Sequence, residues 1–260
     1  ADSVYASEDF GDNVHVFSTE PERIVLDEIG VAVYGISFSS PHLEEPLLKR
    51  FGGLDFDPDL TNILVMHGEV VSRGAGSDYN PIYPELIEEF PFDYVALGHV
   101  HSFSGINKFV GSKNRRETYM AYPGIPEPRN FGECGEKGVI AGNIEAGENS
   151  LNFVRICRRC FRNISVDITG TGDSQRIYEL ILSEIDKYDK DDIFRIDLTG
   201  TFEEDFTPDL ASLSEQLKDA AFYLEIEDDS DASLNYLNYK DETGLRGVFV
   251  RMMMERLERT

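Results

Sequence analysis

Two histidines stand one residue apart in the segment DYVALGHVHSF, residues 93–103, directly after an apolar run and Gly98. In an extended chain, side chains two positions apart point the same way, with their roots about 6 to 7 Å apart. His99 and His101 can therefore supply one imidazole each to two metal ions that lie about 3.5 to 4 Å from each other. Neutral imidazole suits manganese, iron or zinc, whereas magnesium prefers oxygen ligands.

A third histidine stands in an equivalent place. His67 ends the apolar run NILVM and is followed by Gly68. Two buried strands that each finish in histidine bring these side chains together at one edge of a sheet, where sites in α/β folds form. A single histidine at a strand end is more often an exposed or hydrogen-bonded residue than a ligand, so the metal-site prediction depends on all three.

A short basic stretch follows the histidine pair. The segment NKFVGSKNRR, residues 107–116, contains no acidic residue, and a solvated loop is an alternative to a phosphate contact there. The candidates for contact with a substrate phosphate in this stretch are Lys113, Arg115 and Arg116.

One further arginine is a candidate for the same task. Arg129, in PEPRNFGE, can bind a phosphate through two parallel hydrogen bonds. The alternative is an ion pair with Glu127 or Glu133.

Composition limits the classes of function. The chain has 260 residues and a formal net charge of −25, so nucleic acid is repelled unless a local basic patch or bound metal ions meet its phosphates. It shows neither a long apolar run nor a signal peptide, and we expect a cytoplasmic protein with no membrane partner. The C-x-x-C pair, Cys157 and Cys160, is a weak zinc or redox signal, and strand positions explain it better.

The patterns divide the chain into two regions. Residues 14–156 read as strands separated by turns, with helices only at LEEPLLKRF and IYPELIEEF, and runs as apolar as ILVM suggest sheets buried on both faces. From about residue 160 the order is β-α-β-α-β: a helix capped by Asp173 and another after Thr207 separate three alternating strands. A final amphipathic helix, GVFVRMMMERLER, ends the chain.

Three segments carry a resemblance to a known family. NILVMHG, DYVALGHVH and YPGIPEPRNFGECGEKG are similar to the C-terminal part of the nuclease domain of calcineurin-like metallophosphoesterases. More narrowly, they resemble the DNA double-strand-break repair exonuclease subunits of SbcD and YhaO type. ISVDITG, DIFRIDLTG and FYLEIED resemble this family's capping domain.

The resemblance implies a fold and a chemistry. We expect an α/β protein with part of a metallophosphoesterase β-sandwich flanked by helices (αββα) over residues 1–159, and a small α+β capping domain over residues 160–260. His67 and His99 would bind one metal ion and His101 another, the ions being most often manganese. The implied function is hydrolysis of DNA phosphodiesters in repair, with an SMC-like ATPase as partner and a homodimer as the assembly.

One departure qualifies this expectation. The family's N-terminal Asp-x-His, Gly-Asp and Asn-His motifs are missing, so we expect a fragment with little activity by itself and an unpaired apolar sheet edge. Two alternatives remain open. The chain is either another metallophosphoesterase, acting on small phosphodiesters or phosphoproteins, or a non-catalytic homologue.

Overall fold

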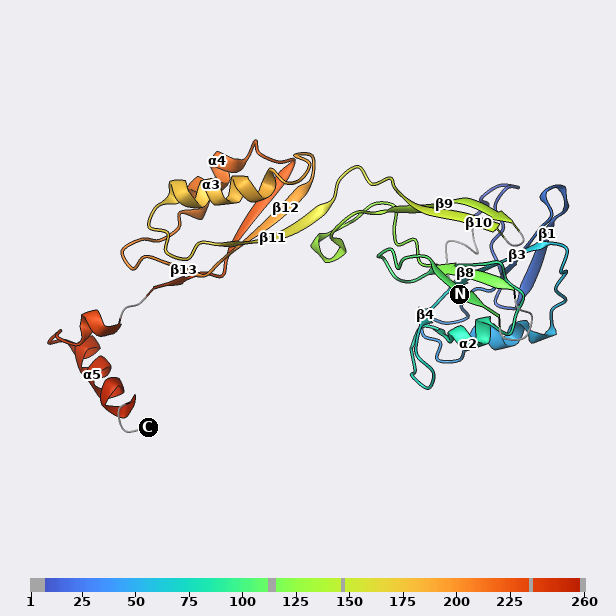
Figure 1. The fold of residues 1–260 in the computed structure, drawn as a ribbon, viewed down its shortest axis with the longest axis horizontal. Coiled ribbons are helices and arrows are strands. Elements are labelled where there is room, and N and C mark those ends of the chain that lie inside the picture. The colour runs from blue at the N-terminus through green and yellow to red at the C-terminus, as the bar shows by residue number, and fades with distance from the viewer. Residues whose placement is uncertain (1–7, 112–115, 146–147, 234–235, 258–260) are drawn as a thin grey trace. The chain divides into compact units, whose positions relative to one another are not determined.

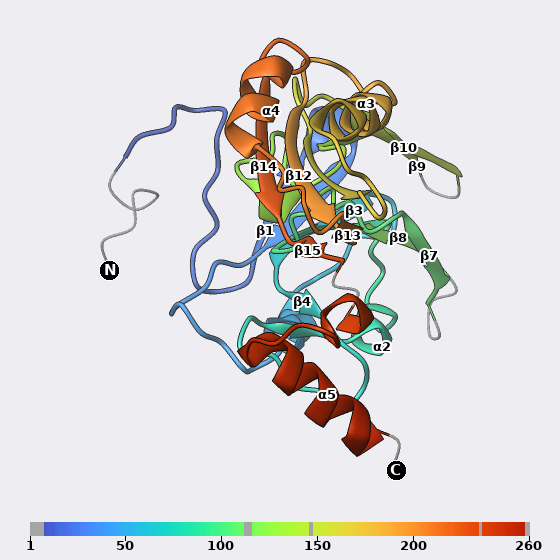
Figure 2. The same ribbon diagram turned by 90° about the vertical axis from the view of Figure 1, so that its left-hand side faces the viewer.

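A computed structural model describes residues 8–111, 116–145, 148–233 and 236–257. The chain forms two compact units. The first contains residues 1–128 and 136–157, and the second contains residues 129–135 and 158–260. Figures 1 and 2 show the elements of both.

A six-stranded mixed sheet organises the first unit, in the order β1-β2-β3-β6-β8-β7. The four inner strands β2, β3, β6 and β8 run parallel, while β1 and β7 pair antiparallel at the two edges. The strands are β1 (Glu22–Leu26), β2 (Val31–Gly35), β3 (Thr61–His67), β6 (Tyr94–Gly98), β7 (Asn107–Val110) and β8 (Glu117–Ala121).

One face of this sheet carries the core. Leu64 and Met66 of β3 lie beside Val95 and Leu97 of β6, and all four are buried. The 3₁₀-helix η2 (Leu47–Gly53) and the single helical turn α2 (Pro84–Ile87) contribute further buried residues to the same core. Burial of these aliphatic side chains is the main stabilisation of the unit.

The opposite face of β3 is open, which contradicts the expectation of burial on both faces. Val65, which points away from the core, is 42 % exposed. The missing N-terminal motifs predict an apolar surface on an unpaired edge, whereas the exposed Val65 lies on a face of the central strand β3. The cause is that, within the described residues, no second large sheet packs on this face, so the expected sandwich is not seen.

Smaller sheets complete the first unit. The hairpin β9 (Gly138–Glu145) and β10 (Glu148–Arg155) is antiparallel, and β4 (Glu69–Val70) pairs parallel with β5 (Pro81–Ile82). The predicted strand at residues 14–17 does not form. Its His15 instead pairs with Glu22 at 2.8 Å.

The second unit follows the predicted β-α-β-α-β order. Its parallel sheet, in the order β11-β12-β14, has α3 and α4 on one face (Figures 1 and 2). The elements are β11 (Phe161–Asp167), α3 (Ser174–Ile185), β12 (Ile193–Thr199), α4 (Leu210–Leu217) and β14 (Tyr223–Asp228).

Local signals explain why these elements form. The Asp173 carboxylate accepts a hydrogen bond from the Arg176 amide and caps α3, as predicted. The cap of α4 is Asp209 rather than Thr207, because the Asp209 side chain accepts from the Ser212 amide. Alternating residues of the strands and the stripe of α3 share one core, which includes Ile164, Ile177, Ile181, Ile196 and Leu198.

Several further elements complete the structure. The strand β13 (Thr201–Phe202) pairs with β15 (Asp231–Ala232), η4 (Tyr236–Tyr239) contacts the terminal helix α5 (Leu245–Leu257), and η1 (Asp27–Ile29) lies in the first unit. The turn η3 (Phe131–Glu133) was placed in the first domain from sequence. It packs with the second unit because the Phe131 ring lies 4.9 Å from that of Phe161. No helix in the described residues is long and apolar enough to span a membrane.

Candidate metal centre

Two of the three predicted histidines meet at the ends of neighbouring strands. His67 is the last residue of β3 and pairs in register with Gly98, the last residue of β6. His99 follows directly, and its ring centroid lies 5.1 Å from that of His67 in an edge-to-face arrangement. A side chain at position 98 would crowd this pair, since a Cβ there would lie 3.1 Å from His67 Nδ1.

The backbone at His99 is unusual. Its φ angle is +119°, a region that residues with a side chain rarely adopt. Such strain persists where the surroundings hold it and gathers at functional sites. The turn that follows is held on one side by Ser104, whose amide donates to the Tyr122 carbonyl at 3.2 Å and whose Oγ accepts from the Tyr122 amide at 3.0 Å.

His101 is exposed and lies in the same turn. The pKa of His67 is lowered from 6.5, first because burial disfavours the imidazolium and then because charges on His99 and His101 would repel it. His99 and His101 thus both lie close enough to His67 to act on its imidazole electrostatically. A neutral His67 is the form that binds a metal ion.

Two residues hold the loop that follows His67. Asn80 is fully buried at a φ of +51°; its Nδ2 donates to the His67 carbonyl and its Oδ1 accepts from the Leu47 amide, both at 2.8 Å. The Tyr122 hydroxyl donates to the Gly68 carbonyl at 2.7 Å and accepts from the Val70 amide at 2.9 Å. The sequence analysis did not identify Asn80, because only its long-range contacts reveal its role.

Aromatic rings flank the histidine pair. The Phe38 ring lies 5.4 Å from that of His67, and the Tyr79 ring lies 4.9 Å from that of His99. Tyr79 also packs against His42, at 5.7 Å. These rings restrict the orientations of the two imidazoles.

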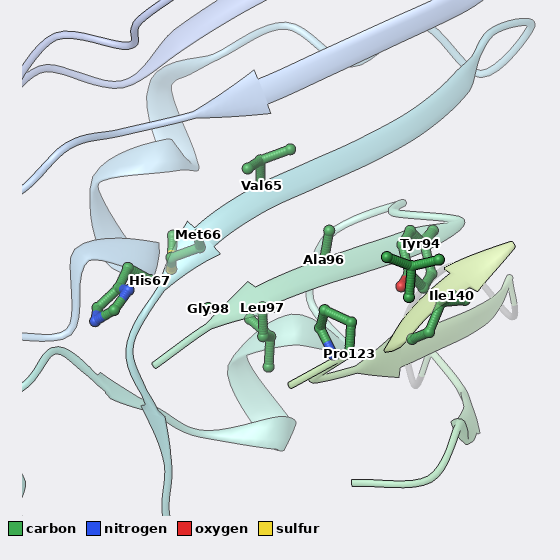
Figure 3. A pocket seen from close by; sticks show the side chains of 10 residues that line it. Val65, Met66, His67, Tyr94, Ala96, Leu97, Gly98, Pro123 and Ile140 are labelled. Carbon is green, nitrogen blue, oxygen red and sulfur yellow. The ribbon is translucent and has the colours of Figure 1, made fainter. Parts of the chain in front are cut away.

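An apolar pocket adjoins His67 on the open face of the sheet. It has a volume of about 540 Å³ and lies between the ends of β3 and β6 and the start of β9, with His67 at one end (Figure 3). A second pocket, of about 550 Å³, is lined by Phe17 and by residues 36–38, which follow β2, and shares Val65, Met66 and His67 with the first. The imidazole of His67 therefore stands at the border of both.

The donor set fits part of a metal centre. Imidazole nitrogens suit manganese, iron or zinc, and the ring separation of His67 and His99 allows both to approach one ion. Within the described residues, however, no three histidine, cysteine or acidic side chains group to hold an ion. The described residues thus supply two adjacent nitrogen donors and a nearby third, without a bridging carboxylate.

The two candidate phosphate contacts that the structure describes, Arg116 and Arg129, each have an acidic partner within the fold. Lys113 and Arg115 lie outside the described residues. The Arg116 guanidinium donates from Nε to Asp93 at 2.6 Å and from Nη2 to the Leu60 carbonyl at 3.2 Å. Because Arg116 precedes β8, which runs parallel to β6, it lies at the opposite end of the sheet from His99.

The remaining candidate has a partner of its own. Arg129 belongs to the second unit, and its Nη2 donates to Glu133 at 2.6 Å, which is one of the pairings the sequence left open. Cys157 and Cys160 are buried and lie in different units, and the Cys157 sulfur accepts from the Lys137 amide at 3.3 Å.

Comparison with known proteins gives a distant relationship. No family model matches the chain. Over 183 residues, 69 % of its length, the chain is 24 % identical to "Uncharacterized metallophosphoesterase YhaO" of Bacillus subtilis (strain 168). The match spans 43 % of that relative. The chain is therefore distantly similar to a metallophosphoesterase.

Proposed function

We propose that this protein is a metal-dependent phosphodiesterase that cleaves DNA as the nuclease subunit of a repair complex. The observation that carries the proposal is the meeting of His67 and His99, with rings 5.1 Å apart, at the ends of two adjacent parallel strands. The distant similarity to a metallophosphoesterase supports the reaction class. DNA, an SMC-like ATPase and a second copy of the chain are the proposed partners.

In this proposal each histidine has a defined task. His67 and His99 would bind one divalent ion, manganese being the one we propose, and His101 would bind a second. Two such ions would supply a water of lowered pKa and would offset the charge of the scissile phosphate. The residues of the chain keep His67 neutral and in place: burial lowers the pKa of its imidazole, and Asn80 fixes the main chain behind it.

A second substrate class is favoured by charge. The formal net charge of −25 opposes binding of a DNA backbone, and a small phosphodiester would meet much less repulsion. Arg116 and Arg129, two of the proposed phosphate contacts, have acidic partners within the fold. This second reading keeps the same metal centre and changes only the substrate.

Metal binding by histidine variants tests the centre. Isothermal titration with Mn²⁺ should show binding by the wild-type chain and a loss of about tenfold or more for His67→Ala and for His99→Ala. His15→Ala is the matched control, since His15 pairs with Glu22 and is not among the groups that act on the pKa of His67. Equal Mn²⁺ binding by all four proteins would contradict the proposal.

Substrate assays separate the two readings. The protein is given a linear DNA duplex and, in parallel, bis(p-nitrophenyl) phosphate, each with Mn²⁺ and with a chelator. Manganese-dependent DNA cleavage, even at the low rate expected of this chain, supports the nuclease. Cleavage of the small diester alone supports the second reading.

A further inference from the structure

We propose that Lys137 is a positioning residue, whose buried ammonium holds the His99–His101 turn in the conformation that presents its imidazoles. This inference rests on the proposed function for its purpose, but its structural content can be tested in the absence of metal. Lys137 is 2 % exposed, although lysine is almost never fully buried without a partner. Its Nζ donates to the His101 carbonyl at 3.0 Å.

The ammonium is not held by an ion pair. Among the described residues, no carboxylate pairs with Lys137, and a main-chain carbonyl in the histidine turn is the acceptor that the structure gives it. Burying a charge without a counter-charge opposes folding. Folding stability alone would therefore favour an apolar side chain at position 137. The hydrogen bond to the histidine turn explains why a lysine stands there.

The lysine is fixed at its own main chain. Its amide donates to the Cys157 sulfur at 3.3 Å, and its carbonyl accepts from the amides of Ile156 and Cys157, each at 3.2 Å. These bonds anchor Lys137 at the base of the β9–β10 hairpin. The ammonium thus reaches the turn from a rigid support.

The turn requires such a support. The φ angle of +119° at His99 is strained, and a strained backbone persists only where its neighbours define it. Ser104 ties the end of the turn to Tyr122, and Gly124, at a φ of +83°, leaves room beside the His101 carbonyl, from which a Cβ would lie only 3.0 Å away. Lys137 supplies the bond in the middle of the turn, at the carbonyl of His101 itself.

Replacement by methionine separates positioning from stability. Lys137→Met keeps an unbranched chain and removes both the charge and the donor, so the protein should remain as resistant to heat as wild type or become more so. The imidazole ¹H–¹³C NMR signals of His99 and His101 should shift or broaden, while those of His15 and His42 stay in place. Mn²⁺ affinity should fall by about tenfold or more. Lys137→Arg, which keeps a cationic donor, should restore much of both properties.

The matched control is Lys108→Met. Lys108 lies exposed on β7 and pairs with Glu117 at 2.8 Å, and its replacement should leave all the histidine signals unchanged. If Lys137→Met does not fold, the same NMR spectra are recorded for Lys137→Gln. Its side chain is shorter and does not reach the turn, so the His99 and His101 signals should again change. Unchanged His99 and His101 signals in a folded variant overturn the inference. A wild type that binds no Mn²⁺ overturns the proposed function, while the metal-free spectra still decide the role of Lys137.

Discussion

At the scale of single residues, His67 is exposed at the end of β3, yet partial desolvation and the neighbouring His99 and His101 both act on the pKa of its imidazole. Both effects lower its pKa below 6.5, burial being the larger. Since the imidazole of an unfolded chain keeps a pKa near 6.5, the unfolded state binds more protons as the pH falls through that value. The His67 contribution to folding stability should therefore decrease as the solution is acidified below pH 6.5.

NMR titration of the metal-free protein measures this directly. The His67 signal should have its midpoint below pH 6.5, and His99→Ala should raise the midpoint toward 6.5 without reaching it, because burial remains. His42→Ala serves as the control and should have little effect, since His42 is not among the causes of the shift. A wild-type midpoint at or above 6.5 would refute the electrostatic description of the site.

Asn80 combines a backbone strain with two long-range hydrogen bonds. Asn80→Ala leaves the His67 carbonyl and the Leu47 amide without their partner and keeps a side chain at a φ of +51°. The loss of paired buried groups should destabilise the protein by about 1–3 kcal/mol. In Asn80→Gly the same bonds are lost, but the backbone is relieved, so it should be more stable than the alanine variant by about 1–2 kcal/mol.

Urea unfolding of the two variants and the wild type gives these differences. Equal stability of the alanine and glycine variants would show that the left-handed backbone carries no strain. If the alanine variant is as stable as the wild type, Asn80 does not support the main chain at His67.

At the scale of elements, a buried ion pair joins the beginnings of three strands. Asp93, 2 % exposed, precedes β6 and accepts from the Asn62 amide of β3 at 2.8 Å and from Arg116, which precedes β8, at 2.6 Å. Arg116→Met leaves the Asp93 carboxylate buried without its cation, which should cost about 3–5 kcal/mol. Lys187→Met is the control: it breaks an exposed pair with Glu184 on the surface of the second unit and should cost less than about 1 kcal/mol.

Chemical denaturation followed by circular dichroism measures both values. If Arg116 served substrate rather than structure, its replacement would lower activity and leave stability nearly unchanged. That outcome would contradict the role the ion pair indicates.

The sequence predicted elements well where their signals are local. Asp173 begins α3 as expected, and the alternation of Ile164 and Ile196 marks buried faces of β11 and β12. The predicted helices at residues 43–51 and 82–90 became a 3₁₀-helix and a single turn, because prolines at positions 46 and 84 leave few residues to continue each. Local sequence patterns do not predict the length of an element, because tertiary contacts determine where it ends.

The site was predictable to the same extent. His67 and His99 stand at strand ends that the sequence marks, and the parallel pairing of β3 and β6 brings them together. Arg116 lies near the histidine pair in sequence, yet the parallel direction of β8 places it at the other end of the sheet. Asn80 and Lys137 contact residues that are distant in sequence, and the local spacing of residues does not predict such contacts.

At the scale of the whole molecule, the net charge decides how the chain can bind DNA. The chain has two units with separate cores, and 49 acidic residues against 24 basic ones. A surface of this sign repels a phosphate backbone over about 8 Å at physiological ionic strength. Because acidic residues outnumber basic ones, binding of DNA requires additional cations, such as bound metal ions.

We therefore expect binding of DNA to depend on divalent metal. Fluorescence anisotropy of a labelled duplex at about 0.15 M salt should show no binding by the chain in a chelator and measurable binding in Mn²⁺. His99→Ala should abolish the manganese-dependent part, because it removes one imidazole of the pair, whereas His15→Ala should retain it. Salt-sensitive binding in the chelator would instead indicate a local basic surface. In that case, replacing Lys113 and Arg115 together by serine would show whether the stretch after β7 forms it, since loss of two phosphate contacts should reduce the dependence of log affinity on log salt by about 2.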